Sequence, residues 1–193
     1  MIAWINFAVL ILASLLFLYF YMLSASPATR EKVLGSSAYA RCGRDRIVAS
    51  VFELIIVINY VIYYFYPLPT PLPEKFPWAW WVSALIAVVI AVPSTALMLI
   101  GVRDAGEETL RPKKEHTMYG GIYTKLRHPQ AVGEVFLWWV IAFLLHSPFL
   151  ALFSFIYIPI FIMMSLAEEQ DLLWRYGDAY AEYCKRTGAF WPK

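Results

Sequence analysis

Long apolar stretches separated by short polar segments are the main pattern of this sequence. Residues 2–23 carry no charged side chain. A helix of that length covers about 33 Å, which fits a hydrocarbon core of about 30 Å. Four further apolar stretches cover residues 47–66, 78–100, 129–145 and 149–167. The pattern therefore predicts an all-α, polytopic integral membrane protein with five transmembrane helices.

The segments between these stretches predict turns and short helices. Alternating prolines from Pro67 to Pro73 cannot continue a helix, and His146-Ser147-Pro148 predicts a tight turn. The last two spans should therefore form a helical hairpin. Residues 24–46 are expected to be a polar, basic loop. Beyond the fifth span we expect further helix, a helix end at Gly177 and a short cytoplasmic helix over residues 178–187.

Composition and charge placement support this interpretation. Hydrophobic residues make up 61% and charged residues 16% of the chain, against about 50% and 25% in soluble domains. Of the 16 Lys and Arg residues, only Lys75 falls on one predicted side, and the other fifteen fall on the opposite side. The positive-inside rule then predicts an outer N-terminus, with the C-terminus and the polar segments in the cytoplasm.

Several other classes of protein lack a signal in the sequence. Cys42 and Cys184 fall in predicted cytoplasmic segments, where a disulfide is not expected, and they form no Cys/His cluster typical of a metal site. The first apolar stretch lacks a basic flank and is too long for a cleavable signal peptide. Nucleotide-binding glycine motifs are absent, and a nucleic-acid face is not expected at a membrane surface. The expected partner is the lipid bilayer.

Two polar segments flank the predicted hairpin and should become neighbours when it folds. Arg127 and His128 precede Pro129, which suits the first turn of a helix, so the free N–H groups of that turn could bind an anion. Glu168 and Glu169 lie near the predicted end of the fifth span, where a carboxylate calls for a cationic partner. The same residues are equally typical of side chains that face lipid headgroups or form ion pairs.

Polar residues inside the predicted spans have a simpler interpretation. Glu134, Glu53 and Asn59 are expected mainly to form hydrogen bonds between helices. Gly120-Gly121 followed by Tyr123 predicts a flexible turn beside an aromatic ring.

The polar motifs of the last 80 or so residues occur in an order that resembles a known family. The chain has Gly121-Ile-Tyr123, Leu126-Arg-His-Pro129, Gly133-Glu134, Glu168-Glu169, Tyr176-Gly177, Tyr180, Tyr183, Phe190 and Pro192. This combination is similar to the isoprenylcysteine carboxyl methyltransferases, and the size matches a compact prokaryotic member such as an archaeal one. The wider group includes phospholipid N-methyltransferases. The resemblance divides the chain into a three-span part, residues 1–112, and a methyltransferase-like catalytic part, residues 113–193.

The resemblance implies methyl transfer from S-adenosylmethionine to the carboxylate of a prenylated cysteine, with S-adenosylhomocysteine as the product. Arg127 would orient the acceptor carboxylate and Glu168 would face the positive charge of the donor. The implied cofactor contacts are His116, Thr117, Met118, Tyr119, Tyr123, His128, Pro129, Gln130, Ala131 and Glu168, with Glu115 as an alternative to Tyr119. The chain departs from the family at Ala131, where a Tyr is common, and at Met164, where an Arg occurs.

Three alternatives stay open. A phospholipid amine acceptor would have to lose a proton, so a base such as Glu134 or His116 would matter. A sterol-type membrane reductase has a similar C-terminal half and would bind NADPH instead. A membrane scaffold or transport component is the non-enzymatic alternative, although a conduction path would place polar groups across the bilayer midplane.

Overall fold

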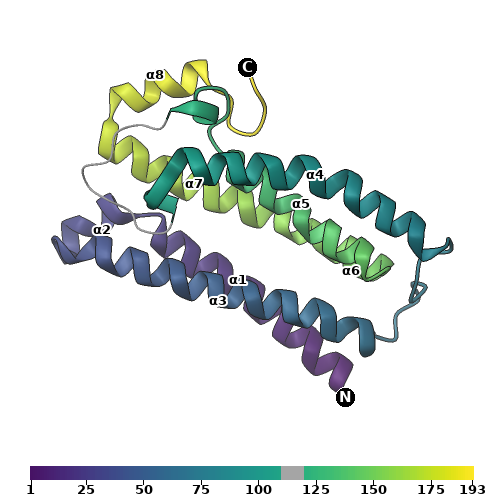
Figure 1. Ribbon diagram of the computed structural model, residues 1–193. Helices are drawn as coiled ribbons and strands as arrows, with labels where there is room; N and C mark the ends of the chain where they lie inside the picture. The colour runs from purple at the N-terminus through teal and green to yellow at the C-terminus, as the bar shows by residue number, and fades with distance from the viewer. Residues whose placement is uncertain (110–119) are drawn as a thin grey trace.

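The computed structural model describes residues 1–109 and 120–193 of the chain as an assembly of helices (Figure 1). The longer α-helices are α1 (Ile2–Ser24), α3 (Ser37–Phe65), α4 (Trp80–Ala105), α5 (Pro129–Leu144) and α7 (Tyr157–Tyr176). The shorter ones are α2 (Pro27–Leu34), α6 (Pro148–Phe153) and α8 (Asp178–Arg186), with 3-10 turns η1 (Gly106–Thr109), η2 (Gly121–Thr124) and η3 (Ser154–Ile156).

The all-α, polytopic architecture predicted from the sequence is confirmed. Helices α1, α3 and α4 and the continuous stretch Pro148–Tyr176 are each long and apolar enough to cross a bilayer. The fourth predicted span is the 16-residue α5, which at 1.5 Å per residue is only about 24 Å long. This shorter helix begins at Pro129, directly after Arg127 and His128.

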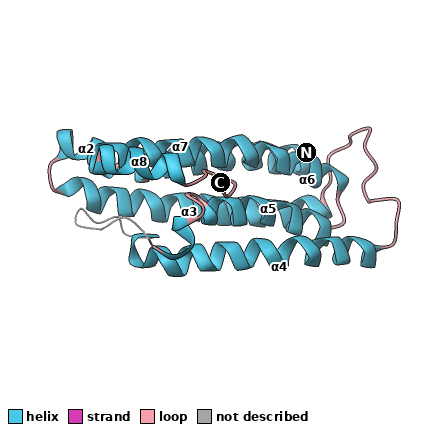
Figure 2. Ribbon diagram, turned by 90° about the horizontal axis from the view of Figure 1, so that it is seen from above, coloured by secondary structure: helices cyan, strands magenta, loops and turns pink. Residues whose placement is uncertain are grey.

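The long helices run side by side, and the polar segments collect at one end (Figures 1 and 2). Helices α1 and α3 pack along each other, as do α4 and α5, while α7 contacts α1, α2, α5 and α8. We call the end that carries α2, η2 and α8 the polar end. The opposite end carries the N-terminus, the proline-rich segment 66–79 and the turn between α5 and α6.

Close packing fixes the α4–α5 pair. A Cβ atom added to Gly133 would lie 2.5 Å from the backbone oxygen of Ser94 and 2.6 Å from the backbone nitrogen of Met98. Only a residue without a side chain allows the two backbones to approach this closely, which is a common device in membrane helix pairs. The pairing holds the first turn of α5 against the end of α4.

The buried centre of the bundle is aromatic and internally hydrogen-bonded. Tyr157 stacks on Trp138 with ring centroids 4.2 Å apart, and its hydroxyl lies 3.1 Å from that of Ser14. Tyr60 reaches Ser154 at the same distance. A hydroxyl without a partner is costly where water is excluded, so these pairs fix how α1 fits against α7 and how α3 fits against η3.

The basic segment between the first two spans is largely helical, which corrects the predicted loop at residues 24–46. Pro27 begins α2, and the backbone N–H of Thr29 donates to the buried carboxylate of Asp171 on α7 at 3.0 Å. Arg30 pairs with Asp45 and also donates to the carbonyl of Leu23. A carboxylate at a helix N-terminus stabilises that helix, and here it comes from a distant part of the chain.

Candidate functional site

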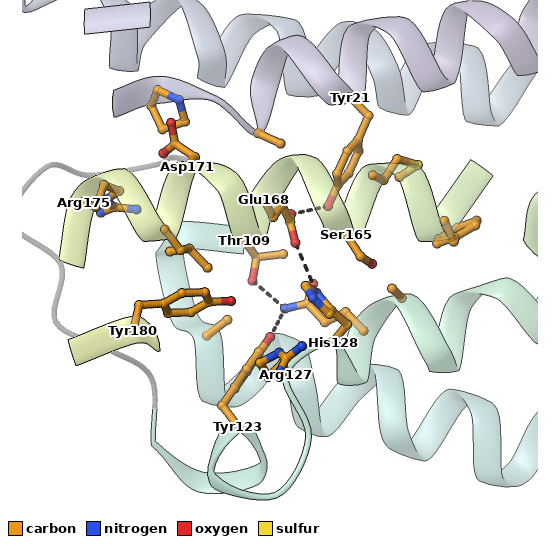
Figure 3. A pocket seen from close by; sticks show the side chains of 18 of the residues that line it. Tyr21, Thr109, Tyr123, Arg127, His128, Ser165, Glu168, Asp171, Arg175 and Tyr180 are labelled. Carbon is orange, nitrogen blue, oxygen red and sulfur yellow. Dashed lines mark hydrogen bonds and ion pairs between the residues drawn. The ribbon is translucent and has the colours of Figure 1, made fainter. Parts of the chain in front are cut away.

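A cavity opens at the polar end of the bundle, where α1, α3, α5, α7 and α8 converge (Figure 3). The space free of atoms is about 1130 Å³, including the part open to solvent. Its lining includes cationic, acidic and aromatic side chains from both parts of the chain. The polar and aromatic ones include Tyr21, Arg46, Tyr123, Arg127, His128, Gln130, Glu134, Ser165, Glu168, Asp171 and Tyr180.

Residues 127–129 lie next to Glu168 and Glu169, as expected from the folding of the predicted hairpin. His128 is the N-cap of α5. Its Nε2 atom lies 2.8 Å from Oε1 of Glu169, and its Nδ1 atom lies 3.6 Å from Oε2 of Glu168. The buried imidazole therefore sits between two carboxylates, which Figure 3 shows for Glu168.

The two glutamates are not at a helix terminus, which corrects one step of the sequence argument. Helix α7 continues to Tyr176, so Glu168 and Glu169 lie about two turns before its end. The predicted cationic partners are nevertheless present, because Arg127 and His128 both contact Glu169. The pairing follows from packing rather than from a need to offset an unfavourable helix end.

Glu168 is the member of the pair that lines the cavity. Its Oε1 atom accepts a hydrogen bond from the hydroxyl of Tyr21 at 2.8 Å and lies 3.9 Å from Nη2 of Arg46. Its Oε2 atom has His128 at 3.6 Å, beyond a normal hydrogen bond, so this oxygen retains capacity to accept another donor. Groups from α1, α3 and the start of α5 thus hold one carboxylate at the cavity wall.

Burial and charge have opposite effects on His128. Burial alone would lower the pKa of the imidazole, but interactions with Glu168 and Glu169 outweigh it and raise the pKa above its usual value. The protonated ring offers donors to both carboxylates. His128 therefore links α5 to α7 most strongly in its charged form.

Arg127 holds the C-terminal segment in place. Its Nε atom donates to Glu169 at 2.8 Å, and its Nη1 atom donates to the backbone oxygens of Cys184 and Thr187 at 3.1 and 2.7 Å. The backbone N–H of Arg127 also donates to the oxygen of Gly188 at 2.9 Å. These bonds commit much of the guanidinium to the protein itself, although the residue also borders the cavity.

The start of α5 is tied to the turn before it. Gln130 donates from Nε2 to the hydroxyl of Tyr123 at 2.8 Å and to Oγ1 of Thr109 at 3.4 Å. Tyr183 donates to the backbone oxygen of Tyr123 at 2.6 Å. Burial raises the pKa of Tyr123, so its hydroxyl stays protonated. These contacts make one wall of the cavity from η2, α5 and α8.

Of the remaining predicted site residues, one borders the cavity, one does not, and the others lie outside the described residues. Ala131 borders the cavity, whereas Pro129 is fully buried against the helix pair and is not part of the lining. His116, Thr117, Met118 and Tyr119, with the alternative Glu115, lie outside the described residues. In the described part of the chain no group of three His, Cys, Asp or Glu side chains is arranged to hold a metal ion.

Among the lining residues from the N-terminal part, Tyr21 and Arg46 approach Glu168 and were not predicted. Tyr21 lies in a stretch already rich in aromatic residues, so the sequence gives it no distinguishing signal. Arg46 was counted only as a basic loop residue, yet it donates to the backbone oxygen of Thr109 at 2.9 Å and approaches Glu168. Both reach the site only because α1 packs against α7 and α3 packs against α1.

Comparison with known proteins gives a match to a family model over part of the chain. Residues 85–179 match the phospholipid methyltransferase family. This range contains most of α4, all of α5 to α7, and the His128 and Glu168 positions. No curated protein and no solved structure matches the chain. The match supports the resemblance at the level of this wider family of membrane methyltransferases.

Proposed function

We propose that the protein transfers a methyl group from S-adenosylmethionine to a lipid-like acceptor at the membrane surface. The observation that carries this proposal is the placement of Glu168 at the wall of a cavity that α5 and α7, both within the family-matched region, help to line. The sequence resemblance favours the carboxylate of a prenylated cysteine as the acceptor. The family match itself gives reason to keep a phospholipid amine as a second candidate.

The charges of the cavity suit the methyl donor. S-adenosylmethionine carries a sulfonium, an ammonium and a carboxylate, and it supplies an already activated methyl group. Glu168 would face a positive group, while the first N–H groups of α5 next to Gln130 and Ala131 favour a negative one. Tyr21 and Tyr180 add aromatic surface at the same cavity, and ring faces attract cations.

The protein residues would act mainly by positioning and by excluding water. Because the donor is activated, most of the barrier reduction must come from holding two reactants in line. Glu168 accepts a hydrogen bond from Tyr21 and lies close to His128, so the direction of its carboxylate is fixed. Arg127 would act by holding Glu169 and the C-terminal segment in place. An ionised acceptor carboxylate would need no base.

The open side of the cavity is proposed to face the cytoplasm. The polar end carries α2 and α8 with their Lys and Arg side chains, and the basic segments of the sequence meet there. The lipid-like acceptor would approach from the bilayer, where Phe161 and Met164 border the cavity. The two reactants then enter from different phases.

Cofactor binding tests this proposal most directly. Protein purified in detergent should bind S-adenosylmethionine and S-adenosylhomocysteine in a calorimeter. It should also move a labelled methyl group to a prenylcysteine or an aminophospholipid. Binding of NADPH in place of either would support the reductase alternative. If none of these three ligands binds to the folded protein, the proposal is wrong and the scaffold alternative gains.

A further inference from the structure

The outer face of α3 is an apolar stripe that ends in two arginines. Exposed large hydrophobic side chains recur along this helix every three or four residues, at Ile47, Val51, Leu54, Ile58, Val61 and Phe65. This spacing puts them on one face, and from first to last the helix rises about 27 Å, close to a hydrocarbon core of about 30 Å. Arg44 continues this face by one turn at the polar end, and Arg41 lies beside it, one turn earlier. A stripe that spans the core therefore places both arginines at the level of the lipid headgroups (Figure 1).

The two arginines differ from others at the polar end in having no protein partner. Three of the others have a carboxylate, in the pairs Arg30–Asp45, Arg103–Asp104 and Arg127–Glu169. Arg41 and Arg44 are both exposed, and within residues 1–109 and 120–193 neither side chain has a hydrogen bond, an ion pair or a ring contact. A guanidinium carries five N–H donors and no acceptor, so two of them side by side form a site for an anion from outside the protein.

This face of α3 is separate from the cavity. Arg46 lines the cavity and approaches Glu168 at 3.9 Å. Arg44 precedes it by two residues, which turns its side chain about 200° around the helix, toward the outside. Neither Arg41 nor Arg44 is among the residues that line the cavity. A ligand of this pair is therefore held at the outer surface and is not the methyl acceptor.

We infer that Arg41 and Arg44 bind the phosphate group of an anionic phospholipid, whose acyl chains lie along the apolar stripe of α3. The planar guanidinium forms paired hydrogen bonds with phosphate oxygens. One leaflet of the core is about 15 Å thick, which corresponds to about ten residues of α3 from Ile47 onward, so the stripe offers enough apolar surface for the acyl chains.

Charge selects the class of lipid. A zwitterionic lipid carries its own cation next to the phosphate, and that cation repels the two arginines. An anionic lipid leaves the charge of its phosphate uncompensated, so it gains the full attraction of both side chains. A free phosphate ion or an acidic protein segment would match the arginines but would leave the stripe below them uncovered. The lipid is bound and not methylated, so the inference does not depend on the proposed function.

Native mass spectrometry of the full chain in detergent tests the inference by measuring how tightly lipids bind. The probes are phosphatidylglycerol and phosphatidylcholine with identical acyl chains, and inorganic phosphate serves as a competitor without acyl chains. The test variant carries Arg41→Gln and Arg44→Gln. The matched control carries Lys125→Gln and Arg186→Gln, which removes two other exposed cations that have no side-chain partner in the described parts of the chain and lie outside α3. Thermal unfolding reports that each variant is folded.

We expect wild-type protein and the control to bind phosphatidylglycerol about 30-fold more tightly than phosphatidylcholine, because each basic side chain near the surface contributes about fivefold. The Arg41→Gln, Arg44→Gln variant should keep a preference of about threefold or less. If this double variant does not fold, Arg44→Gln alone should still lower the preference about fivefold.

Three results would overturn the inference: equal binding of the two lipids by wild-type protein, an unchanged preference in the folded variant, or the same loss of preference in the control. Displacement of phosphatidylglycerol by inorganic phosphate at a concentration similar to that of the lipid would also overturn it, because it would assign the arginine pair to a free anion.

Discussion

The adjacent glutamates of α7 allow a sharp test, because only one of them faces the cavity. We expect Glu168→Gln to weaken binding of S-adenosylmethionine strongly, while Glu169→Gln leaves the binding site nearly intact. Glutamine keeps the size of the side chain and can still accept the hydrogen bond from Tyr21. The substitution therefore removes the charge with little change in packing.

The magnitude follows from the contact that would be lost. A hydrogen bond to a charged group contributes about 1.5–3 kcal/mol. Since about 1.4 kcal/mol corresponds to a tenfold change in affinity, the dissociation constant should rise between about tenfold and about 150-fold. Glu169 instead contacts Arg127 and His128 with its own side chain 18% exposed. Its neutralisation should cost about 1–3 kcal/mol of folding stability, below the cost of breaking a fully buried pair.

Calorimetry in detergent gives the two dissociation constants, and thermal unfolding of the same samples gives the stabilities. The expected result is a separation of effects: Glu168→Gln mainly lowers affinity, and Glu169→Gln mainly lowers the unfolding temperature. Folded Glu168→Gln protein that binds the donor within about threefold of wild type would refute the role assigned to this carboxylate.

Three further predictions concern the framework of the site. Arg127→Lys keeps the charge, but a lysine cannot bond to Glu169 and to both carbonyls at once. The variant should lose about 1–3 kcal/mol of folding stability and show faster hydrogen exchange in residues 183–190. Unchanged exchange would contradict the inference that Arg127 holds the C-terminal segment in place. Gly133→Ala should lower the folding stability by about 1–3 kcal/mol in thermal unfolding, since the added Cβ would overlap the backbone near Ser94. An unchanged unfolding temperature would show that α4 and α5 can move apart with little loss of stability. His128 has a raised pKa in the folded protein, so its contribution to stability is fully present below the pKa of the unfolded state and is lost as the pH rises through the pKa of the folded state. His128→Gln should therefore flatten the pH dependence of the unfolding temperature. An unaltered pH dependence in this variant would show that another group causes it.

Much of the site could be predicted because its residues lie in short ordered motifs. The hairpin geometry alone placed His128 beside Glu168 and Glu169, and the structure brings them within 3.6 Å. The contacts of Arg127 were harder to predict, because its bonds to Cys184 and Thr187 join segments far apart in the sequence. The sequence shows that an arginine stands at position 127, but it does not show which acceptors its guanidinium bonds to.

The helical character of residues 24–46 shows the same limit. Local composition favours a basic loop there, yet Asp171 accepts from Thr29 and stabilises the start of α2. Tyr21 and Arg46 likewise enter the site through packing and carry no motif of their own. Groups that act through long-range contacts leave no local pattern in the sequence.

The sequence by itself determined that the chain is an all-α membrane protein, because long apolar stretches in a bilayer must satisfy their backbone hydrogen bonds within helices. It also determined that most charged side chains gather at one end, since charge is expelled from the hydrocarbon. Only the tertiary structure decided which carboxylate borders the cavity and which is bound by Arg127 and His128. Neighbours in sequence point in different directions on a helix, and the partners that distinguish Glu168 from Glu169 come from other helices.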